Sequence, residues 1–355
     1  MIKNDERIPV TVLTGFLGSG KTTLLQKLLG GREGAGVAVL MNELGEVALD
    51  DLYIQKMTET TLVLKNGCVC CSMRSDLQKG LRELIDGRSS GTVPPFDRIL
   101  IETTGLADPT PIAQTLVGDL MLRRQVRLAN IITTIDAIFG AGQIDTHPES
   151  MRQAAIADRL VLTKTDIAEP EQIRQAREKI HQVNPVAVLL DANEEESLWT
   201  QLFDIDPFNP KTKSTEVQAW LKCLPKIQTA GSRRFSDKTG RIQQYHQEQH
   251  KEGEIQTFSI RTETPLNWTA FCIWLSALIH RYGPQLLRIK GLLNVPDALG
   301  PVVLNTVQSH ITPPMHLEEW PSEDHSSRIV FIVQGISPER VEYSLRCFLS
   351  ILENS

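Results

Sequence analysis

Three cysteines fall within four consecutive positions of this 355-residue chain, in the segment "NGCVCCSMRSDL" at residues 66–77. Alternate and adjacent thiolates such as Cys68, Cys70 and Cys71 can bind one soft metal cation, and Gly67 allows the backbone to turn sharply. We predict a helix over residues 73–87, which places the last two cysteines near its N-terminus, where the helix dipole lowers the pKa of a thiol. The spacing predicts a transition-metal site; a redox switch and unliganded cysteines are the alternatives.

A loop this short is not expected to supply all the ligands of a tetrahedral ion. The missing ligand is predicted to be an acid from "NELGEV", with Glu46 as the first choice and Glu43 as the second, or a water molecule or a group from a partner protein. An incomplete shell suits a carrier, because closed four-thiolate sites hold zinc structurally whereas open sites exchange it.

The segment "GFLGSGKT", Gly15 to Thr22, fits the phosphate-binding pattern G-x-x-x-x-G-K-[ST] between a predicted strand and a predicted helix. Backbone N–H groups around Gly18 and Gly20 can surround phosphate oxygens. Lys21 can bridge the β- and γ-phosphates, and the Thr22 hydroxyl can ligate Mg²⁺. The nucleotide-binding residues predicted here are Gly15, Gly18, Ser19, Gly20, Lys21, Thr22 and Thr23. An ordinary glycine-rich turn is the alternative.

An acid and a glycine follow another predicted strand, in "RILIETTGLADP". Glu102 is placed to hold Mg²⁺ through water, and the N–H of Gly105 can report whether a γ-phosphate is present. Lys21, Thr22 and Glu102 are the predicted catalytic residues, with Glu102 also able to orient the attacking water. Without a neighbouring phosphate loop, Glu102 would be interpreted as a solvated acid at a strand end.

The segment "RLVLTKTD" ends in Thr163, Lys164 and Asp166, a pattern that predicts guanine recognition. Guanine presents two donors on one edge, N1–H and the N2 amine, and the Asp166 carboxylate can accept both. Adenine has no amine at C2, so a site built to bind that amine can reject adenine by a factor of about 10⁴ or more. The Lys164 stem is expected to pack against the base. GTP-binding proteins more often have Asn at the position of Thr163, and a plain strand-to-helix turn is the alternative.

Short apolar runs alternate with helical patterns over the first two hundred residues, which predicts a doubly wound α/β domain with a mostly parallel sheet. The predicted strands are "IPVTVLTG", "GVAVLMNE", "TTLVLKNG", "RILIETTG", "NIITTIDA", "RLVLTKTD" and "PVAVLL", and the predicted helices are 21–30, 73–87, 109–123 and 170–183. Residues 1–205 are assigned to this domain and 206–253 to a partly disordered linker. Residues 254–355 are predicted to form a smaller α+β domain, with helices at 265–282 and from 338 on.

A formal charge of −6 gives the chain no global attraction to nucleic acid or to an anionic membrane. No stretch of about 18 apolar residues occurs, and the N-terminal sequence does not resemble a secretory signal. We therefore expect a cytoplasmic protein without nucleic-acid or membrane partners, in a compartment where clustered cysteines favour metal binding or redox chemistry.

The motifs "TGFLGSGKTTLL", "NELGEV", "NGCVCC", "ETTGLADP" and "LTKTD", in this order, resemble those of the CobW-type metallochaperone GTPases. These are relatives of the nickel-handling GTPases that serve hydrogenase and urease. Segments of the second domain, "LLRIKGLLNV", "VQSHITPP" and "LEEWPSEDHSSRIVFI", resemble the family as well, so that the likeness covers almost the whole chain.

The resemblance implies a GTPase that binds zinc or cobalt at the C-x-C-C loop and delivers it to a client protein under control of the nucleotide. It makes Cys70 and Cys71 the firmer ligands and Cys68 the weaker one, and it is compatible with a homodimer paired across the nucleotide sites. Two rival hypotheses are a P-loop kinase or ATPase with incidental cysteines and a redox-responsive nucleotide-binding regulator.

Overall fold

The computed structural model describes residues 6–30, 36–42, 62–66, 73–193, 198–204, 217–218, 254–296, 298–312 and 314–353. The chain divides into two compact units, Met1–Ala219 and Trp220–Ser355. The predicted metal ligands Glu46, Cys68, Cys70 and Cys71, and the second-choice Glu43, lie outside the described residues.

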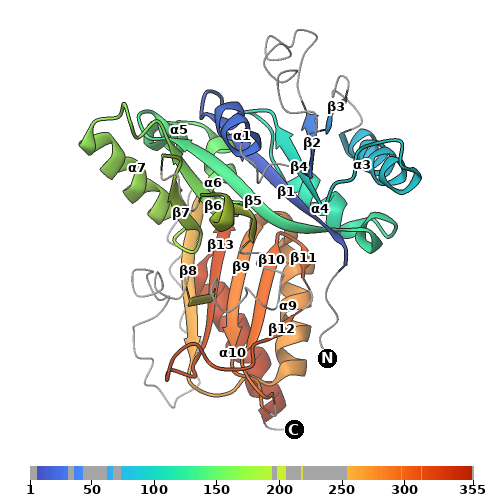
Figure 1. Cartoon of the computed structure of the whole chain (residues 1–355). Coiled ribbons are helices and arrows are strands. Elements are labelled where there is room, and N and C mark those ends of the chain that lie inside the picture. Colours follow the sequence, from blue (N-terminus) through green and yellow to red (C-terminus); the bar gives the residue numbers. More distant parts are fainter. Residues whose placement is uncertain are drawn as a thin grey trace. The chain divides into compact units, whose positions relative to one another are not determined.

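In the described part of the first unit, seven strands form a sheet in the order β3-β2-β4-β1-β5-β6-β7 (Figure 1). All of the strand pairs are parallel, as the buried apolar runs predicted. The strands are β1 (Ile8–Gly15), β2 (Val37–Asn42), β3 (Leu62–Asn66), β4 (Arg98–Thr103), β5 (Val126–Asp136), β6 (Arg159–Thr163) and β7 (Val188–Asp191). Because the strands are parallel, their carboxyl ends share one edge, and the loops at that edge carry the predicted site.

Helices cover both faces of this sheet. They are α1 (Lys21–Leu29), α3 (Met73–Ser90), α4 (Thr110–Gly118), η2 (Leu122–Arg124), α5 (Gly140–Thr146), α6 (Pro148–Ile156), α7 (Pro170–Val183) and η3 (Thr200–Asp204). The leucines of α1 share a core with η3 and one face of the sheet, while α4 and α6 contact β5. α7 begins and ends at the predicted residues, whereas the helix predicted over 109–123 ends at Gly118.

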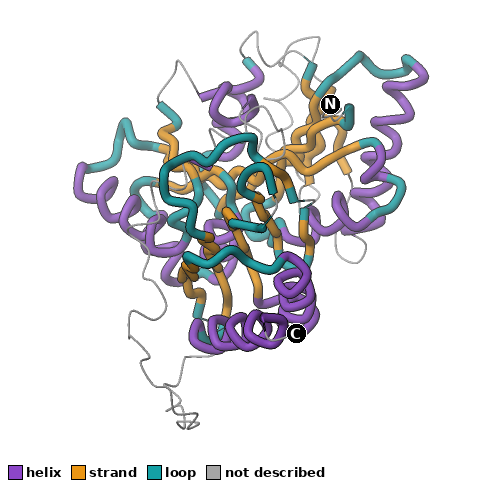
Figure 2. The backbone as a smooth tube through the Cα atoms, turned by 90° about the horizontal axis from the view of Figure 1, so that it is seen from below, coloured by secondary structure: helices purple, strands orange, loops and turns teal. Residues whose placement is uncertain are grey.

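In its described residues, the second unit is an α+β structure in which two α-helices cover an antiparallel sheet of order β11-β10-β9-β13-β8, with β12 paired to β10. Its elements are β8 (Ile255–Thr262), α9 (Trp268–Tyr282), η5 (Gly283–Gln285), β9 (Leu286–Leu293), β10 (Val302–Val307), β11 (His310–Ile311), β12 (Met315–His316), β13 (Ser327–Gln334) and α10 (Pro338–Glu353). The two helices lie side by side (Figure 2), and Trp274 Nε1 of α9 donates to Ser344 Oγ of α10 at 2.9 Å.

The second unit's core is apolar, and none of the described helices has both the length and the hydropathy to cross a membrane. Phe271, Leu275 and Leu278 of α9 are buried in this core. The helix begins three residues later than predicted, because Asn267 is its N-cap and accepts a hydrogen bond from Ala270 N.

Candidate functional site

The phosphate loop between β1 and α1 depends on glycine at defined points. Gly15, Gly18 and Gly20 have φ values of 144°, 72° and 84°, which side chains rarely permit. A Cβ at Gly15 would lie 2.2 Å from Thr134 Oγ1. The glycines of the motif therefore allow both the turn of the loop and its close approach to β5.

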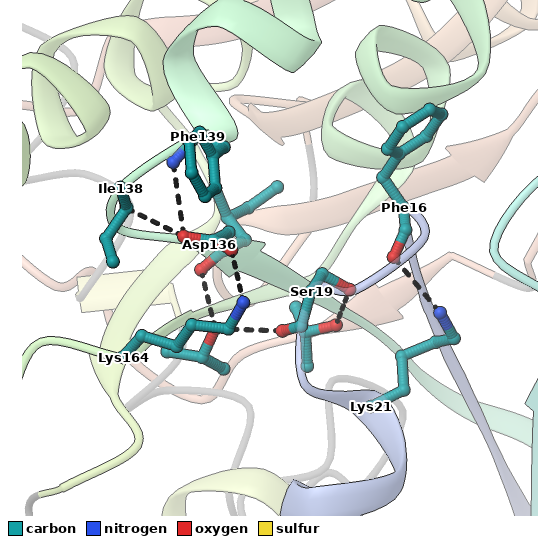
Figure 3. Close-up of polar contacts among 10 residues, drawn as sticks. Phe16, Ser19, Lys21, Asp136, Ile138, Phe139 and Lys164 are labelled. Atoms are coloured by element: carbon teal, nitrogen blue, oxygen red, sulfur yellow. Dashed lines mark hydrogen bonds and ion pairs between the residues drawn. The ribbon is translucent and has the colours of Figure 1, made fainter. Parts of the chain in front are cut away.

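Hydroxyl groups at the ends of β5 and β6 hold this loop (Figure 3). Ser19 Oγ shares a hydrogen bond of 2.7 Å with Thr134 Oγ1, and Thr163 Oγ1 donates to Ser19 O at 2.8 Å. Since the peptide group is planar, holding Ser19 C=O also orients the N–H of Gly20 toward the opposite side. Thr163 thus connects the predicted base-recognition loop to the phosphate loop.

The Lys21 ammonium lies over the loop that precedes it. Its Nζ donates to Gly15 O at 2.8 Å. It also donates to Phe16 O at 3.1 Å (Figure 3). Burial lowers the pKa of Lys21, and the Glu102 carboxylate opposes that shift. The cation is therefore held among groups of the site, and its contact with phosphates stays a prediction.

The two predicted Mg²⁺ ligands meet. Thr22, in the first turn of α1, donates from Oγ1 to Glu102 Oε1 at 3.1 Å, and Glu102 near the end of β4 is 6% exposed. A hydroxyl and a carboxylate oxygen are ligands that Mg²⁺ prefers. Their pairing beside the phosphate loop fits a magnesium site, and the sequence predicted both residues.

Gly105 lies against the phosphate loop as well. A Cβ at this position would come within 2.7 Å of Leu17 N and 2.8 Å of Leu17 Cα, so only glycine allows this approach. The preceding residues are tied to β1, because Thr103 Oγ1 donates to Thr14 Oγ1 at 2.8 Å. The structure thus brings Gly105 to the loop that is predicted to hold the phosphates.

The predicted base-recognition loop is fixed through Asp136, at the end of β5 (Figure 3). Lys164 has a positive φ of 59°, and its Nζ lies 2.6 Å from Asp136 Oδ2. Asp136 Oδ1 accepts from Ile138 N at 2.7 Å and from Phe139 N at 3.2 Å. Asp136 is 1% exposed, and these bonds engage both of its oxygens. Asp136 is not among the site residues predicted from the sequence.

Asp166 has a neighbour that the sequence did not predict, Asn193. Asn193 Nδ2 lies 3.4 Å from Asp166 Oδ1 and donates to Thr165 Oγ1 at 2.7 Å. Thr165 in turn donates to Asp191 Oδ1 at 2.7 Å, at the end of β7. These contacts join segments more than 25 residues apart, which no local motif could have indicated.

The predicted transition-metal ligands lie outside the described residues. Within the described ranges, no group of three or more His, Cys, Asp or Glu side chains could hold a metal ion. The strands that lead to the relevant segments are described, however. β2 ends at Asn42, just before "ELGEV", and β3 ends at Asn66, just before "GCVCC".

The model of the CobW/HypB/UreG nucleotide-binding domain matches residues 9–191, and that of the cobalamin synthesis protein CobW C-terminal domain matches residues 255–349. The chain belongs to the CobW/HypB/UreG family. The first match covers the whole sheet of the first unit apart from one residue of β1, and with it every residue of the phosphate and base loops described above.

Among similar proteins is the zinc chaperone YjiA of Escherichia coli, 30% identical over 335 residues, which cover 94% of this chain and 96% of that protein. The zinc-regulated GTPase metalloprotein activator 1 of Schizosaccharomyces pombe is 38% identical over 191 residues, covering 52% of this chain and 45% of the activator. The crystal structure of Zn(II)-bound YjiA GTPase from E. coli superposes with a TM-score of 0.70 at 25% identity, covering 96% of this chain and 99% of that one.

Proposed function

We propose that this protein is a GTPase that binds zinc or cobalt as cargo and releases it to a client metalloprotein under control of its nucleotide. The ligands would be Cys70, Cys71 and Glu46, with Cys68 as a weaker ligand. Membership in the CobW/HypB/UreG family and the names of the similar proteins support a metal-handling GTPase. The ligand set, the delivery to a client and the use of cobalt are parts of the proposal.

The observation that carries the coupling is the register of three adjacent strands. Asn42 pairs with Asn66 on one side and with Thr103 on the other, and Thr103 follows Glu102. Neighbouring strands lie about 4.8 Å apart, so the backbones that enter the cysteine segment and the magnesium site are separated by roughly 10 Å. The acidic segment begins between them. A change in backbone position at the nucleotide site would therefore have to be transmitted only across these adjacent strands to reach the segments that contain the proposed metal ligands.

GTP hydrolysis would rest on positioning and electrostatics, as in phosphoryl transfer generally. The N–H groups of the phosphate loop and the Lys21 ammonium would bind the phosphates. Thr22 and Glu102 would hold Mg²⁺, which neutralises charge that develops on the phosphate oxygens. Glu102 would also orient the attacking water. We expect slow turnover of the protein alone, because the sequence assigns no arginine finger or water-positioning glutamine.

Asp166 would select guanine over adenine. Its carboxylate accepts the N1–H and N2 amine donors of guanine, whereas adenine would leave it unpaired. The contacts of Thr163 and Lys164 hold this loop against the phosphate loop and Asp136, which supports a single orientation of the bound base.

Anaerobic titration of zinc and cobalt tests the proposal, in the presence of either GDP or a non-hydrolysable GTP analogue. The wild type is expected to bind about one metal ion, with an affinity that differs between the nucleotides by about 5- to 150-fold. Cys70→Ala/Cys71→Ala should lose this binding. Cys272→Ala/Cys347→Ala, which alters two half-buried cysteines of the second unit, should retain it.

Equal metal affinity with both nucleotides would refute the proposed coupling. ATP binding that GTP cannot displace would favour a kinase or ATPase. A reversible disulfide within residues 68–71 together with little bound metal would favour a redox regulator.

A further inference from the structure

Helix α6 holds the Gly105 loop through a buried carboxamide. Gln153 is 0% exposed, and its Nε2 donates to Gly105 O at 3.2 Å and to Ala107 O at 2.9 Å. Both protons of the amide are thus directed at two carbonyl groups of one short loop. The orientation of the amide follows from the same contacts, because the reverse orientation would place Oε1 against two carbonyl oxygens.

These contacts control the direction of the peptide groups around Gly105. The peptide before it is fixed because Thr104 O accepts from Ala107 N at 3.1 Å. The peptide after it is fixed because Gly105 O accepts from Gln153. Because the peptide groups before and after Gly105 are both held, the N–H of Gly105 has a fixed direction. It lies beside the backbone of Leu17, which belongs to the phosphate loop.

The backbone of Gln153 is connected to the phosphate loop by another path. Thr133 Oγ1 donates to Gln153 O at 2.8 Å, and the next residue of β5, Thr134, bonds Ser19 Oγ. Gln153 therefore lies between the loop that binds phosphates and the loop predicted to detect the γ-phosphate. Its neighbour Arg152 pairs with Asp108 at 3.3 Å, so that α6 contacts this segment at two successive residues.

The amide is used only as a donor. Gln153 Oε1 is buried without a hydrogen-bond partner among the described residues, and so is the hydroxyl of Thr104 in the same loop. Most buried polar atoms are paired, so two unpaired ones mark a loop whose polar groups are not all satisfied in this arrangement.

We infer that Gln153 is a positioning residue that sets the Gly105 loop and thereby determines how strongly the protein prefers a triphosphate to a diphosphate. The inference rests on the proposed function, because it assumes that Gly105 contacts the γ-phosphate. Gln153 acts through the carbonyl groups of Gly105 and Ala107 rather than by contact with nucleotide or metal.

The test compares the dissociation constants for GDP and a non-hydrolysable GTP analogue in Gln153→Met, which keeps the length of the side chain but removes both donors. We expect the affinity for GDP to stay within about twofold, and the preference for the analogue over GDP to change by about fivefold or more. A global change of stability would alter both constants together, so the ratio isolates the loop.

Asn184→Leu is the matched control. Asn184 is 1% exposed, and its Nδ2 donates to Ala154 O, Ala155 O and Ala157 O at 2.9–3.0 Å, at the C-terminal end of the same helix. The substitution removes buried amide donors that contact carbonyl groups of the helix rather than of the Gly105 loop, together with the acceptor for Ala187 N. This variant should lower the melting temperature and leave the nucleotide ratio unchanged.

Gln153→Glu supplies a second test that does not depend on the first variant folding well. Burial beside two carbonyl groups raises the pKa of the new carboxyl, and its protonated form can donate one hydrogen bond. The nucleotide ratio should be abnormal at pH 8 and return toward the wild-type ratio at pH 6.

A ratio that stays within twofold of wild type in Gln153→Met and is independent of pH in Gln153→Glu would overturn the inference alone. A wild-type protein that does not distinguish the GTP analogue from GDP, with or without metal, would overturn the proposed function as well.

Discussion

Thr163→Val tests whether one hydroxyl group connects base recognition to phosphate binding. Thr163 is 5% exposed, and its Oγ1 donates to Ser19 O at 2.8 Å and lies 3.2 Å from Ile135 O. Valine preserves the shape of the side chain but leaves the Ser19 carbonyl without this donor. An unsatisfied buried polar group costs about 1–3 kcal/mol.

The free protein can relieve that cost by rotating the peptide between Ser19 and Gly20, which turns the N–H of Gly20 away from the phosphate site. Binding must then restore the orientation, so up to about 1–3 kcal/mol is lost from affinity, or about 5- to 150-fold in Kd. GDP and the GTP analogue should lose affinity equally, because the loop is predicted to bind phosphates that both contain. Isothermal titration calorimetry with each nucleotide measures the loss.

Thr115→Val is the control, since Thr115 is also 5% exposed and its hydroxyl donates to a helix carbonyl, that of Pro111, at 2.8 Å. Wild-type affinity is expected for this variant. If Thr163→Val binds GDP as tightly as the wild type does, or if Thr115→Val loses as much affinity, the hydroxyl does not orient the phosphate loop.

Three further variants test the base loop, the phosphate loop and the turn after α4. Asp166→Asn should weaken GTP binding by about tenfold or more and favour xanthosine triphosphate, whose base has an acceptor where guanine has its amine; competition titrations measure the change. Gly15→Ala should lower the free energy of unfolding by about 1–3 kcal/mol in denaturant titrations, because its Cβ would meet Thr134 Oγ1 at 2.2 Å. Asp119→Asn should destabilise the protein near neutral pH but less in acid. Hydrogen bonds from the backbone of Leu122 and Met121, together with Arg82, lower the pKa of Asp119 in the folded protein. The ionised carboxylate therefore stabilises the fold at pH values above the unfolded-state pKa, near 3.8, and this stabilisation is lost as the pH falls through the lowered pKa of the folded state. Melting curves of both proteins between pH 3 and 7 should converge at the acidic end, and a constant difference would contradict this.

Local signals account for the parts of the fold that the sequence predicted correctly. α7 begins at Pro170, where Glu169 and Gln172 form a capping box, and all three residues are visible in the sequence. β1 is an apolar run that ends at the first glycine of the phosphate loop. Here the element and its boundaries are determined by adjacent residues.

Helix ends and short helices that depend on tertiary contacts differ from those that the sequence predicted. The helix predicted over 109–123 ends at Gly118 because Asp119 Oδ1 accepts from Met121 N and Leu122 N, which starts a separate turn. α5 and α6 were not predicted, although Pro148 at the first position of α6 is a recognisable start signal.

The candidate site likewise has residues that local motifs indicate and residues that only tertiary contacts bring in. Short patterns at strand ends were enough to predict roles for the phosphate loop, Glu102 and the base loop, and those roles stay predictions. Gln153, Thr134 and Asn193 were missed, because they reach the site across 27 to 115 residues of sequence. The predicted metal ligands and the domain boundaries at 205 and 253 stay predictions.

The position of β1 in the sheet has a consequence for synthesis of the protein. β1 pairs with β4 and β5, and the loop that follows it is fastened by Thr134 and Thr163. At about 5–20 residues per second, a ribosome needs roughly 7 to 30 s to travel from the phosphate loop to Thr163. A nascent chain therefore carries its most recognisable motif long before it can capture a nucleotide, and truncation ahead of β6 should yield a protein unable to do so.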